Sequence, residues 1–457
     1  MPQSSLPEAS REEIGRLGKA DIMVGIPSFK NAATIGYVVR AAHAGLVQFF
    51  PDSRPILVNS DAGSPDGTQR VVVETEPPDY VEEILLVRPR NRLQRVTLTY
   101  PEVDGVAGKG AALHAIFEMA HALKVQALVV VDSDLRSIGP EWIELLAGPI
   151  LKGGFDFVAP LYARYKWDGT ITNTVTYPLT RALYGHRIRQ PIGGDFGVSG
   201  DLVAHYLEQD DWSADVSRFG IDIWMTTKAL AGGFAVCQAR LGAKVHDPKD
   251  PGADLGPMFR QVVGTLLRLA VKHADSWTET KGSHDTPIYG FERIIDPPPL
   301  RVDVVRLLAE FGNGAAAFGA EWTEILAPRT VEVVLELAAD AGRAASAIRP
   351  GPDWPDDPRL ASAPPPFHFP DHAWARVLYD AIVATRAGAM APERLASALL
   401  PLYFGKVAGL LLETRTADAE QAEETVQRLA RELELAKPYL LRAWEGEAVA
   451  PAVAASA

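Results

Sequence analysis

The chain has 457 residues, of which 47% are hydrophobic and 23% charged, which suits two or three globular domains with a sizeable core. Its net charge of −13 argues against general nucleic-acid binding, because that function needs a basic surface. A single cysteine, Cys237, excludes disulfides within the chain, and the polar first twenty residues lack an apolar signal core. We therefore expect a cytoplasmic protein.

From residue 21 onward, short apolar strands alternate with helices. Helical periodicity predicts helices at 31–50, 108–123 and 219–232, with a shorter helix beginning at residue 67. Apolar runs bounded by turn residues predict strands at 21–27, 54–61, 80–89, 125–132, 155–162 and 234–242. This alternation predicts an α/β fold, a Rossmann-like and mostly parallel sheet with helices on both faces.

From residue 300 the periodicity is that of helices alone. Helices are expected at 301–319, 330–348, 371–385, 392–414 and 422–444, with a proline-rich connector at 349–370. The most apolar of these segments contains Pro401, Lys406 and Gly409, which favours packed helices over a membrane span. The expected organisation is a flexible N-terminus (1–20), an α/β catalytic domain (21–275), an all-helical C-terminal domain (276–445) and a disordered tail (446–457).

An apolar strand ends in two aspartates in the stretch "LVVVDSDLRS" (128–137). In an open α/β sheet ligands bind beyond the carboxyl ends of the strands, where Asp132 and Asp134 are expected. Mg²⁺ and Mn²⁺ prefer oxygen ligands and commonly take one or two carboxylates together with phosphate oxygens. A turn with two solvated aspartates is the alternative, because D-x-D occurs often by chance. The position at the end of a strand favours the metal site.

The stretch "AGKGAALHA" (107–115) predicts a second polar feature at the start of a helix. Lys109 lies where both its charge and the helix dipole favour phosphate, and Gly108 and Gly110 let the backbone approach a ligand. The pattern is not a P-loop. A glycine-rich turn with a solvated lysine is the alternative interpretation.

Four further residues are candidates for the same site. Asp61 follows the second strand and could accept hydrogen bonds from a base or ribose, or simply end a turn. Asp195 lies in the loop "QPIGGDFGVSG", whose glycines indicate close approach to a substrate or a structural hairpin. Asp222 begins a helix among apolar residues, and His246 follows a strand as either a metal ligand or a structural histidine.

Together and in this order, the motifs resemble one group of enzymes. "IPSFKNAATIG", "NSDAGSPDGT", "GKGAAL", "VVVDSDL", "QPIGGDFGVS", "FGIDIWMTT" and "AKVHDP" are similar to the motifs of retaining glycosyltransferases with the GT-A fold. The nearest likeness is to the mannosylglycerate synthase and glucosyl-3-phosphoglycerate/glucosylglycerate synthase families. It covers roughly residues 20–270, and the segment "FHFPDHAWARVLYD" also resembles the helical domain of mannosylglycerate synthases.

The resemblance implies a role for each matching residue. Catalysis would depend on Lys109, Asp134 and Asp222. The metal would be held by Asp134 and His246 together with Asp132, and Asp134 would be the more direct ligand of the two aspartates. Asp222 would also hold hydroxyls of the sugar or acceptor. The nucleotide sugar would lie against Pro27, Asp61, Lys109, Asp132, Ser133, Gly193, Gly194 and Asp195. Asp247 stands where a basic residue would have helped to hold the diphosphate.

The implied reaction transfers glucose or mannose from a GDP- or UDP-sugar to a small anionic acceptor such as D-glycerate or 3-phosphoglycerate. Mg²⁺ or Mn²⁺ would bridge the two phosphates. Acceptor contacts are expected from Arg164, Thr172 and Arg187, with Lys166, Thr174 and Arg189 as further candidates, although arginines are as often simply solvated.

Other functions remain open from the sequence alone. They are a lipid- or polysaccharide-directed glycosyltransferase, a nucleotidyltransferase that makes nucleotide sugars, and a non-enzymatic nucleotide-sugar-binding or scaffolding protein. We expect no nucleic-acid partner and no membrane span. The helices at 301–345 and 371–443 could form a homodimer interface or could cover the sheet.

Overall fold

A computed structural model describes residues 6, 8–79, 81, 93–100, 108–245, 255–292, 297–348 and 366–446. The chain forms two compact units. The sheet unit comprises residues 1–164, 188–248 and 285–297, and the helical unit comprises residues 165–187, 249–284 and 298–457. The boundary therefore differs from the single break expected at 275/276. The segments 165–187 and 249–284 belong to the helical unit, because the helix at 255–272 packs on later helices instead of on the sheet.

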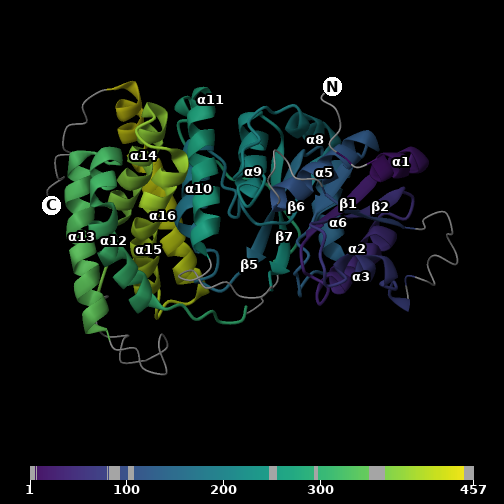
Figure 1. The fold of residues 1–457 in the computed structure, drawn as a ribbon, viewed down its shortest axis with the longest axis horizontal. Coiled ribbons are helices and arrows are strands. Elements are labelled where there is room, and N and C mark those ends of the chain that lie inside the picture. The colour runs from purple at the N-terminus through teal and green to yellow at the C-terminus, as the bar shows by residue number, and fades with distance from the viewer. Residues whose placement is uncertain are drawn as a thin grey trace. The chain divides into compact units, whose positions relative to one another are not determined.

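The sheet unit contains one eight-stranded sheet in the order β3-β2-β1-β4-β6-β5-β7-β8 (Figure 1). Only β6 runs against its neighbours, and the other pairings are parallel, which confirms the mostly parallel sheet. The strands are β1 (Ile22–Ser28), β2 (Pro55–Asp61), β3 (Gln94–Thr99), β4 (Ala127–Val130), β5 (Phe157–Ala163), β6 (Phe196–Ser199), β7 (Val236–Ala243) and β8 (Ile288–Tyr289).

Five of the six predicted strands are confirmed as β1, β2, β4, β5 and β7. The sixth, at 80–89, lies outside the described residues except for Val81, which is helical, so the prediction is wrong at that position. The structure instead has β3 at 94–99, and it adds the short strands β6 and β8. A four-residue strand such as β6, with a glycine inside it, is too short to show a period.

Helices cover both faces of the sheet. They are α1 (Glu8–Leu17), α2 (Ile35–Phe49), α3 (Thr68–Glu74), α5 (Lys109–Ala122), α6 (Glu141–Gly153), α8 (Gly200–Leu207) and α9 (Ile221–Ala231). Successive residues of a strand point to opposite faces. Ile22 and Val24 accordingly pack in one core with α2 and α6. Next to Val24 on β1, Gly25 faces α5, and a Cβ there would lie 2.6 Å from Ile116.

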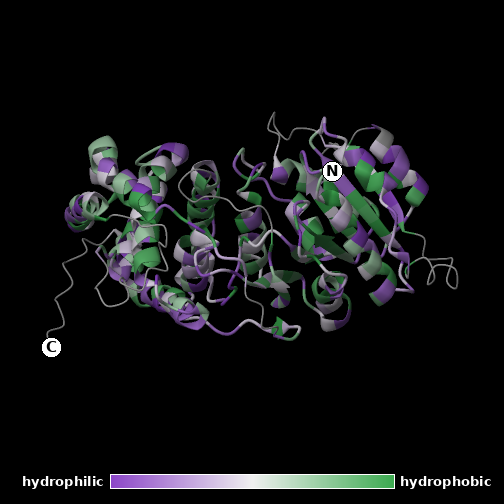
Figure 2. Cartoon of the chain, turned by 90° about the horizontal axis from the view of Figure 1, so that it is seen from below, coloured by the Kyte–Doolittle hydropathy of each residue, from purple (hydrophilic) through white to green (hydrophobic). Residues whose placement is uncertain are grey.

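The hydropathy pattern follows this layering. In Figure 2 the strands of the sheet are largely hydrophobic, whereas the helices of the same unit mix hydrophobic and hydrophilic residues. Within the segment expected to be a flexible N-terminus, residues 8–17 form α1.

Among the described residues, the helical unit contains the five predicted C-terminal helices, together with three helices and one π-helical turn that were not predicted. They are η2 (Thr172–Thr176), α7 (Tyr177–Tyr184), α10 (Leu255–Lys272), α11 (Ala274–Thr278), α12 (Val304–Ile325), α13 (Pro328–Ala347), α14 (Asp371–Ala387), α15 (Pro392–Glu413) and α16 (Ala419–Glu445). Most of the proline-rich connector (349–365) and the tail beyond residue 446 lie outside the described residues.

Helix α15 is the core helix of this unit. It runs through Pro401 as one helix, in agreement with the helix predicted at 392–414. In the described part of the chain, α15 is the one helix long and apolar enough to cross a bilayer, and 89% of its apolar window is buried inside the protein. Such burial is typical of a packed core helix.

Candidate active site

The strand directions explain why polar residues gather at one edge of the sheet. Parallel strands end at the same edge, so Asp132 after β4 and Lys244 after β7 lie together. Because β6 is antiparallel to β4, it begins where β4 ends, and the loop that precedes β6 reaches the same place. Asp195 in this loop accepts a hydrogen bond of 2.8 Å from the backbone N–H of Asp132.

Two lysines hold the carboxylate of Asp132 from opposite sides. The Nζ atom of Lys109, at the start of α5, lies 2.9 Å from Oδ1, and that of Lys244 lies 2.7 Å from Oδ2. Lys109 also donates to Asp222 on the first turn of α9, at 3.2 Å. The structure thus brings together Lys109, Asp132 and Asp222, three of the residues predicted from sequence.

The glycine loop closes over this ion-pair network. Lys244 donates to the carbonyl of Gly193 and to Oδ2 of Asp195, each at 2.8 Å. Gly194 has φ +91°, and a Cβ there would lie 2.3 Å from Oδ2 of Asp132. Only glycine fits at this position, because both the backbone conformation and the space exclude a side chain. The loop predicted to face the donor sugar therefore packs directly on the first aspartate of the D-x-D motif.

Burial and charge act in opposite directions on the pKa values of this network. Burial alone would lower the pKa of Lys109, but attraction to Asp132 and Asp222 raises it above the usual lysine value. Burial would raise the pKa of Asp132, but the two lysines outweigh it and lower that pKa. For Asp222, burial dominates and its pKa is raised. The ion pairs therefore keep Lys109 and Asp132 charged although both side chains are largely buried.

The second aspartate of the motif is held differently. Asp134 is half-buried and forms no hydrogen bond or ion pair with any residue that the structure describes. The turn that presents it is anchored by Ser133, whose Oγ donates to Asn31 at 2.9 Å and whose carbonyl accepts from Thr34 at 2.9 Å. A fixed turn with an uncommitted carboxylate suits a hard divalent cation.

The proposed third ligand cannot be placed. His246 and Asp247 lie outside the described residues. Within the described ranges, no group of three or more His, Cys, Asp or Glu side chains is arranged to hold a metal. The metal site thus remains a prediction that depends on Asp134 and His246, while Asp132 is already committed to two ammonium groups.

Asp61 and Pro27, predicted to border the nucleotide, are both buried. Asp61 accepts hydrogen bonds of 2.6 Å from the Ser28 hydroxyl and 2.6 Å from the Ser64 backbone N–H. The Ser64 hydroxyl adds a third, at 2.8 Å. These bonds join the ends of β1 and β2 to the following turn. In this arrangement Asp61 shapes the edge of the sheet, and its contact with a ribose stays a prediction.

The glycines around Lys109 have a structural partner. A Cβ on Gly110 would lie 1.8 Å from the carbonyl of Val216, and one on Gly108 would lie 2.6 Å from the carbonyl of Ser217. The backbone N–H of Gly110 also donates to Arg218. The absence of side chains at these two glycines therefore lets the segment before α9 pack closely and fixes the position of Lys109. From the sequence, they had been expected to let a ligand approach the backbone.

The predicted acceptor contacts divide between the two units. Arg164 and Arg189 belong to the sheet unit, and the Arg164 guanidinium lies 5.3 Å from the centre of the Tyr162 ring. Lys166, Thr172, Thr174 and Arg187 belong to the helical unit.

Within the helical unit, structural bonds already use several of these groups. Thr174 donates to the carbonyl of Thr170, and Lys166 donates to the carbonyls of Arg415 and Ala417. Arg187 donates through Nε to Ser283 at 3.0 Å. Thr172 is buried in a π-helical turn, a feature often found at functional sites.

Sequence reasoning missed Lys244 and Tyr162. The Tyr162 hydroxyl donates to Asp195, and the Lys244 ammonium lies 5.3 Å from the centre of the Tyr162 ring. A lysine directly after an apolar strand that ends at the ligand edge was the available signal. The motif interpretation used only the next polar residues, His246 and Asp247.

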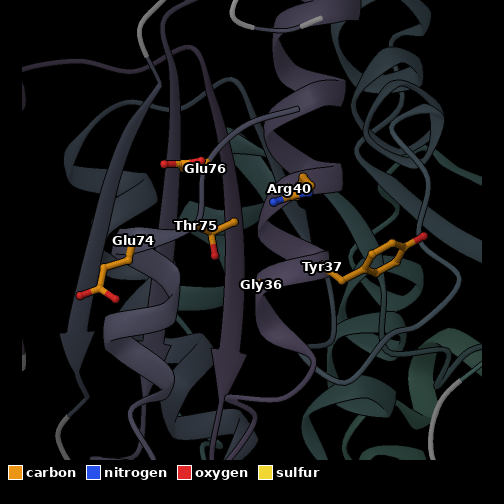
Figure 3. Close-up of a pocket in the computed structure, with 6 residues that line it drawn as sticks. All are labelled: Gly36, Tyr37, Arg40, Glu74, Thr75 and Glu76. Carbon is orange, nitrogen blue, oxygen red and sulfur yellow. The ribbon is translucent and has the colours of Figure 1, made fainter. Parts of the chain in front are cut away.

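A separate hollow of about 480 Å³ lies between α2 and the end of α3 (Figure 3). Arg40 and Thr75 face one another across it, while Tyr37 points away from Glu74 (Figure 3). Its lining residues are Gly36, Tyr37, Arg40, Glu74, Thr75 and Glu76. None of them belongs to the predicted site.

The sheet order, the helices on both faces and the D-x-D motif at the carboxyl end of β4 define the GT-A class of glycosyltransferase fold. No family model matches the chain. The sequence is 29% identical over 270 residues to glucosyl-3-phosphoglycerate synthase of Mycolicibacterium paratuberculosis (strain ATCC BAA-968 / K-10), covering 56% of this chain and 74% of that protein. This similarity confirms the resemblance inferred from the motifs.

Solved structures of glucosyl-3-phosphoglycerate synthase from Mycobacterium tuberculosis are also similar. The complex with Mg²⁺ and UDP is 25% identical, with 56% of this chain and 83% of that chain covered and a TM-score of 0.41. The complex with Mn²⁺, UDP-glucose and phosphoglyceric acid is 25% identical over the same shares of the two chains, with a TM-score of 0.40.

Proposed function

We propose that this protein is a metal-dependent, retaining glycosyltransferase that moves glucose from a nucleoside diphosphate sugar to 3-phosphoglycerate. The observation that carries the proposal is the D-x-D motif at the ligand edge of the sheet, where Asp132 is fixed by two lysines and Asp134 is left uncommitted. The named activity of the Mycolicibacterium relative supports glucose as the sugar and 3-phosphoglycerate as the acceptor.

The residues present fit a divalent cation. Asp134 offers a carboxylate on an anchored turn, and His246 would supply the second protein ligand, with phosphate oxygens and water filling the remaining positions. When bound, Mg²⁺ or Mn²⁺ supplies Lewis-acid neutralisation of the charge that develops on the diphosphate.

The protein side chains supply the remaining chemistry. Lys109 lies at the N-terminus of α5, so its ammonium and the helix dipole both favour the negatively charged diphosphate. Asp222 accepts a hydrogen bond from Lys109, and its carboxylate would also accept hydrogen bonds from hydroxyls of the sugar or acceptor. The backbone of residues 193–195 would border the sugar.

We propose that transfer proceeds with retention, by attack of the acceptor hydroxyl on the face from which the diphosphate leaves. A bond forms between the acceptor oxygen and the anomeric carbon as the bond to the β-phosphate oxygen breaks. The departing phosphate oxygen takes the hydroxyl proton. Asp222 is paired with Lys109, and we assign it a hydrogen-bonding role in preference to that of a covalent nucleophile.

A donor–acceptor matrix tests the proposal. Purified protein with Mg²⁺ or Mn²⁺ is incubated with UDP- or GDP-glucose and UDP- or GDP-mannose, against D-glycerate and 3-phosphoglycerate, and released nucleoside diphosphate is measured. We expect turnover with a glucose donor and 3-phosphoglycerate, an α-anomeric product by NMR, and loss of activity with EDTA. Turnover with none of the acceptors would refute the substrate assignment.

The variant Asp134→Ala tests the metal role within the same matrix. We expect at least a hundredfold loss of turnover, because removal of transition-state charge stabilisation costs about that much. Unchanged turnover in this variant would refute the metal-dependent mechanism.

We further propose a cytoplasmic location, which the single cysteine supports. A homodimer through the helical unit is also proposed, and size-exclusion chromatography with light scattering would distinguish it from a monomer.

A further inference from the structure

We propose that Lys244 is a positioning residue with two effects. It keeps Asp132 out of the metal's coordination shell, and it holds the sugar loop, residues 193–195, against Asp132. This inference deepens the proposed function, on which it rests for the identity of the metal and the donor. It assigns a role to a lysine that pairs with Asp132, the first aspartate of the D-x-D motif.

The three acceptors of Lys244 come from two separate segments. An ammonium group has three N–H donors. The Nζ atom of Lys244 lies 2.7 Å from Asp132, 2.8 Å from the Gly193 carbonyl and 2.8 Å from Asp195. Its side chain is only 4% exposed, so no donor is left for a ligand. One buried cation therefore joins the strand end at residue 132 to the loop at residues 193–195.

This arrangement separates the two aspartates of the D-x-D motif by function. Lys244 occupies Oδ2 of Asp132 and Lys109 occupies Oδ1, so both oxygens are already neutralised. Asp134, two residues later, has no such partner among the described residues. A divalent cation placed beside this motif is attracted to Asp134 and gains little from Asp132.

The position of the sugar loop depends on Lys244, because the loop packs tightly against it. A Cβ on Gly194 would lie 2.9 Å from the Lys244 ammonium, so the loop backbone rests directly on the ion pair. Loss of the ammonium leaves Asp132 and Asp195 as neighbouring carboxylates that repel each other. The loop is then expected to move away from Asp132, while Asp132 becomes available to a metal.

The test variant is Lys244→Met, which removes the ammonium group and keeps an unbranched apolar side chain of similar reach. We expect opposite changes in two measurements. Binding of Mn²⁺ in the absence of nucleotide, measured by calorimetry, should tighten about tenfold, because one more negative charge faces the metal. The turnover number should fall about fiftyfold with little change in KM for 3-phosphoglycerate, because the sugar loop is displaced.

Lys228→Met is the matched control. Lys228 is a buried lysine of the same unit whose ammonium pairs with Asp211 at 2.7 Å. We expect it to lower stability without changing the Kd for Mn²⁺. Unchanged or weaker Mn²⁺ binding in Lys244→Met, or wild-type turnover, would overturn the proposal, since a merely structural lysine would not tighten metal binding.

A second pair of variants covers the case in which Lys244→Met does not fold. In the wild-type background, Asp132→Asn should change the Kd for Mn²⁺ less than threefold, whereas Asp134→Asn should raise it more than thirtyfold. Equal weakening by the two substitutions would refute the role of Lys244. If the wild-type protein turns over no sugar donor but the Mn²⁺ results hold, the proposed function fails and the role of Lys244 stands.

Discussion

The substitution Gly194→Ala is the most direct test of how the glycine loop meets the D-x-D motif. Gly194 has φ +91°, a conformation that costs an L-residue about 1–2 kcal/mol. The new Cβ would also lie 2.3 Å from Oδ2 of Asp132 and 2.9 Å from Nζ of Lys244. Fully breaking a buried ion pair costs about 3–5 kcal/mol. Since these atoms can move apart only in part, we expect a total loss of about 4 kcal/mol.

Gly233→Ala is the matched control for the backbone contribution. Gly233 has φ +71° and no atom within 4 Å of the position that a Cβ would take. This substitution should therefore lower the free energy of unfolding by only about 1–2 kcal/mol, the cost of the backbone conformation alone. The difference between the two variants measures the contact with the ion pair.

Urea denaturation provides the stability measurement, and release of nucleoside diphosphate provides the activity. Gly194→Ala should reduce turnover at least tenfold, while Gly233→Ala should leave it unchanged. Equal losses of stability in the two variants, with normal turnover in both, would refute the close packing of the loop on Asp132.

Three further predictions concern stability. Burial, assisted by the charge of Arg95, lowers the pKa of His43 to about 4. As the pH falls from 6.5, His43 therefore takes up a proton in the unfolded chain but not in the folded protein, and the free energy of unfolding should fall by up to about 3 kcal/mol by pH 4. Urea midpoints across this range should fall less steeply for His43→Leu than for the wild type, and parallel curves would contradict the assignment. Lys406→Met removes the ion pair with Asp371, but Arg428 still pairs with that carboxylate at 2.9 Å. The free energy of unfolding, measured by thermal unfolding, should therefore fall by only about 1–2 kcal/mol, and turnover should be unchanged. A loss above about 3 kcal/mol would show that Arg428 does not compensate for Lys406. Gly110→Ala should destabilise the fold although alanine favours helices, since its Cβ would lie 1.8 Å from the Val216 carbonyl. The control Gly148→Ala should instead stabilise α6 by up to about 1 kcal/mol. If the urea midpoint rises in both variants, the Val216 backbone can move to make room and the predicted clash is refuted.

The sequence predicted the fold class and most elements of the sheet because period and composition are local properties. Five strands and the C-terminal helices follow from apolar runs and helical spacing, which survive packing unchanged. The strands β3 and β6 were not predicted. A four-residue strand between two other strands is stabilised by its neighbours, and its own residues carry almost no signal.

The D-x-D motif and Lys109 were recognisable from sequence because each lies where a strand ends or a helix begins, and such positions can be located along the chain. Their partners could not be found in the same way. Asp132 pairs with Lys244 across 112 residues and Lys109 with Asp222 across 113 residues. The sequence by itself therefore determined which chemical groups stand at the ligand edge. Only the tertiary structure decided that Asp132 is neutralised by two lysines while Asp134 has no ion pair among the described residues, because strand order and the antiparallel β6 set those distances.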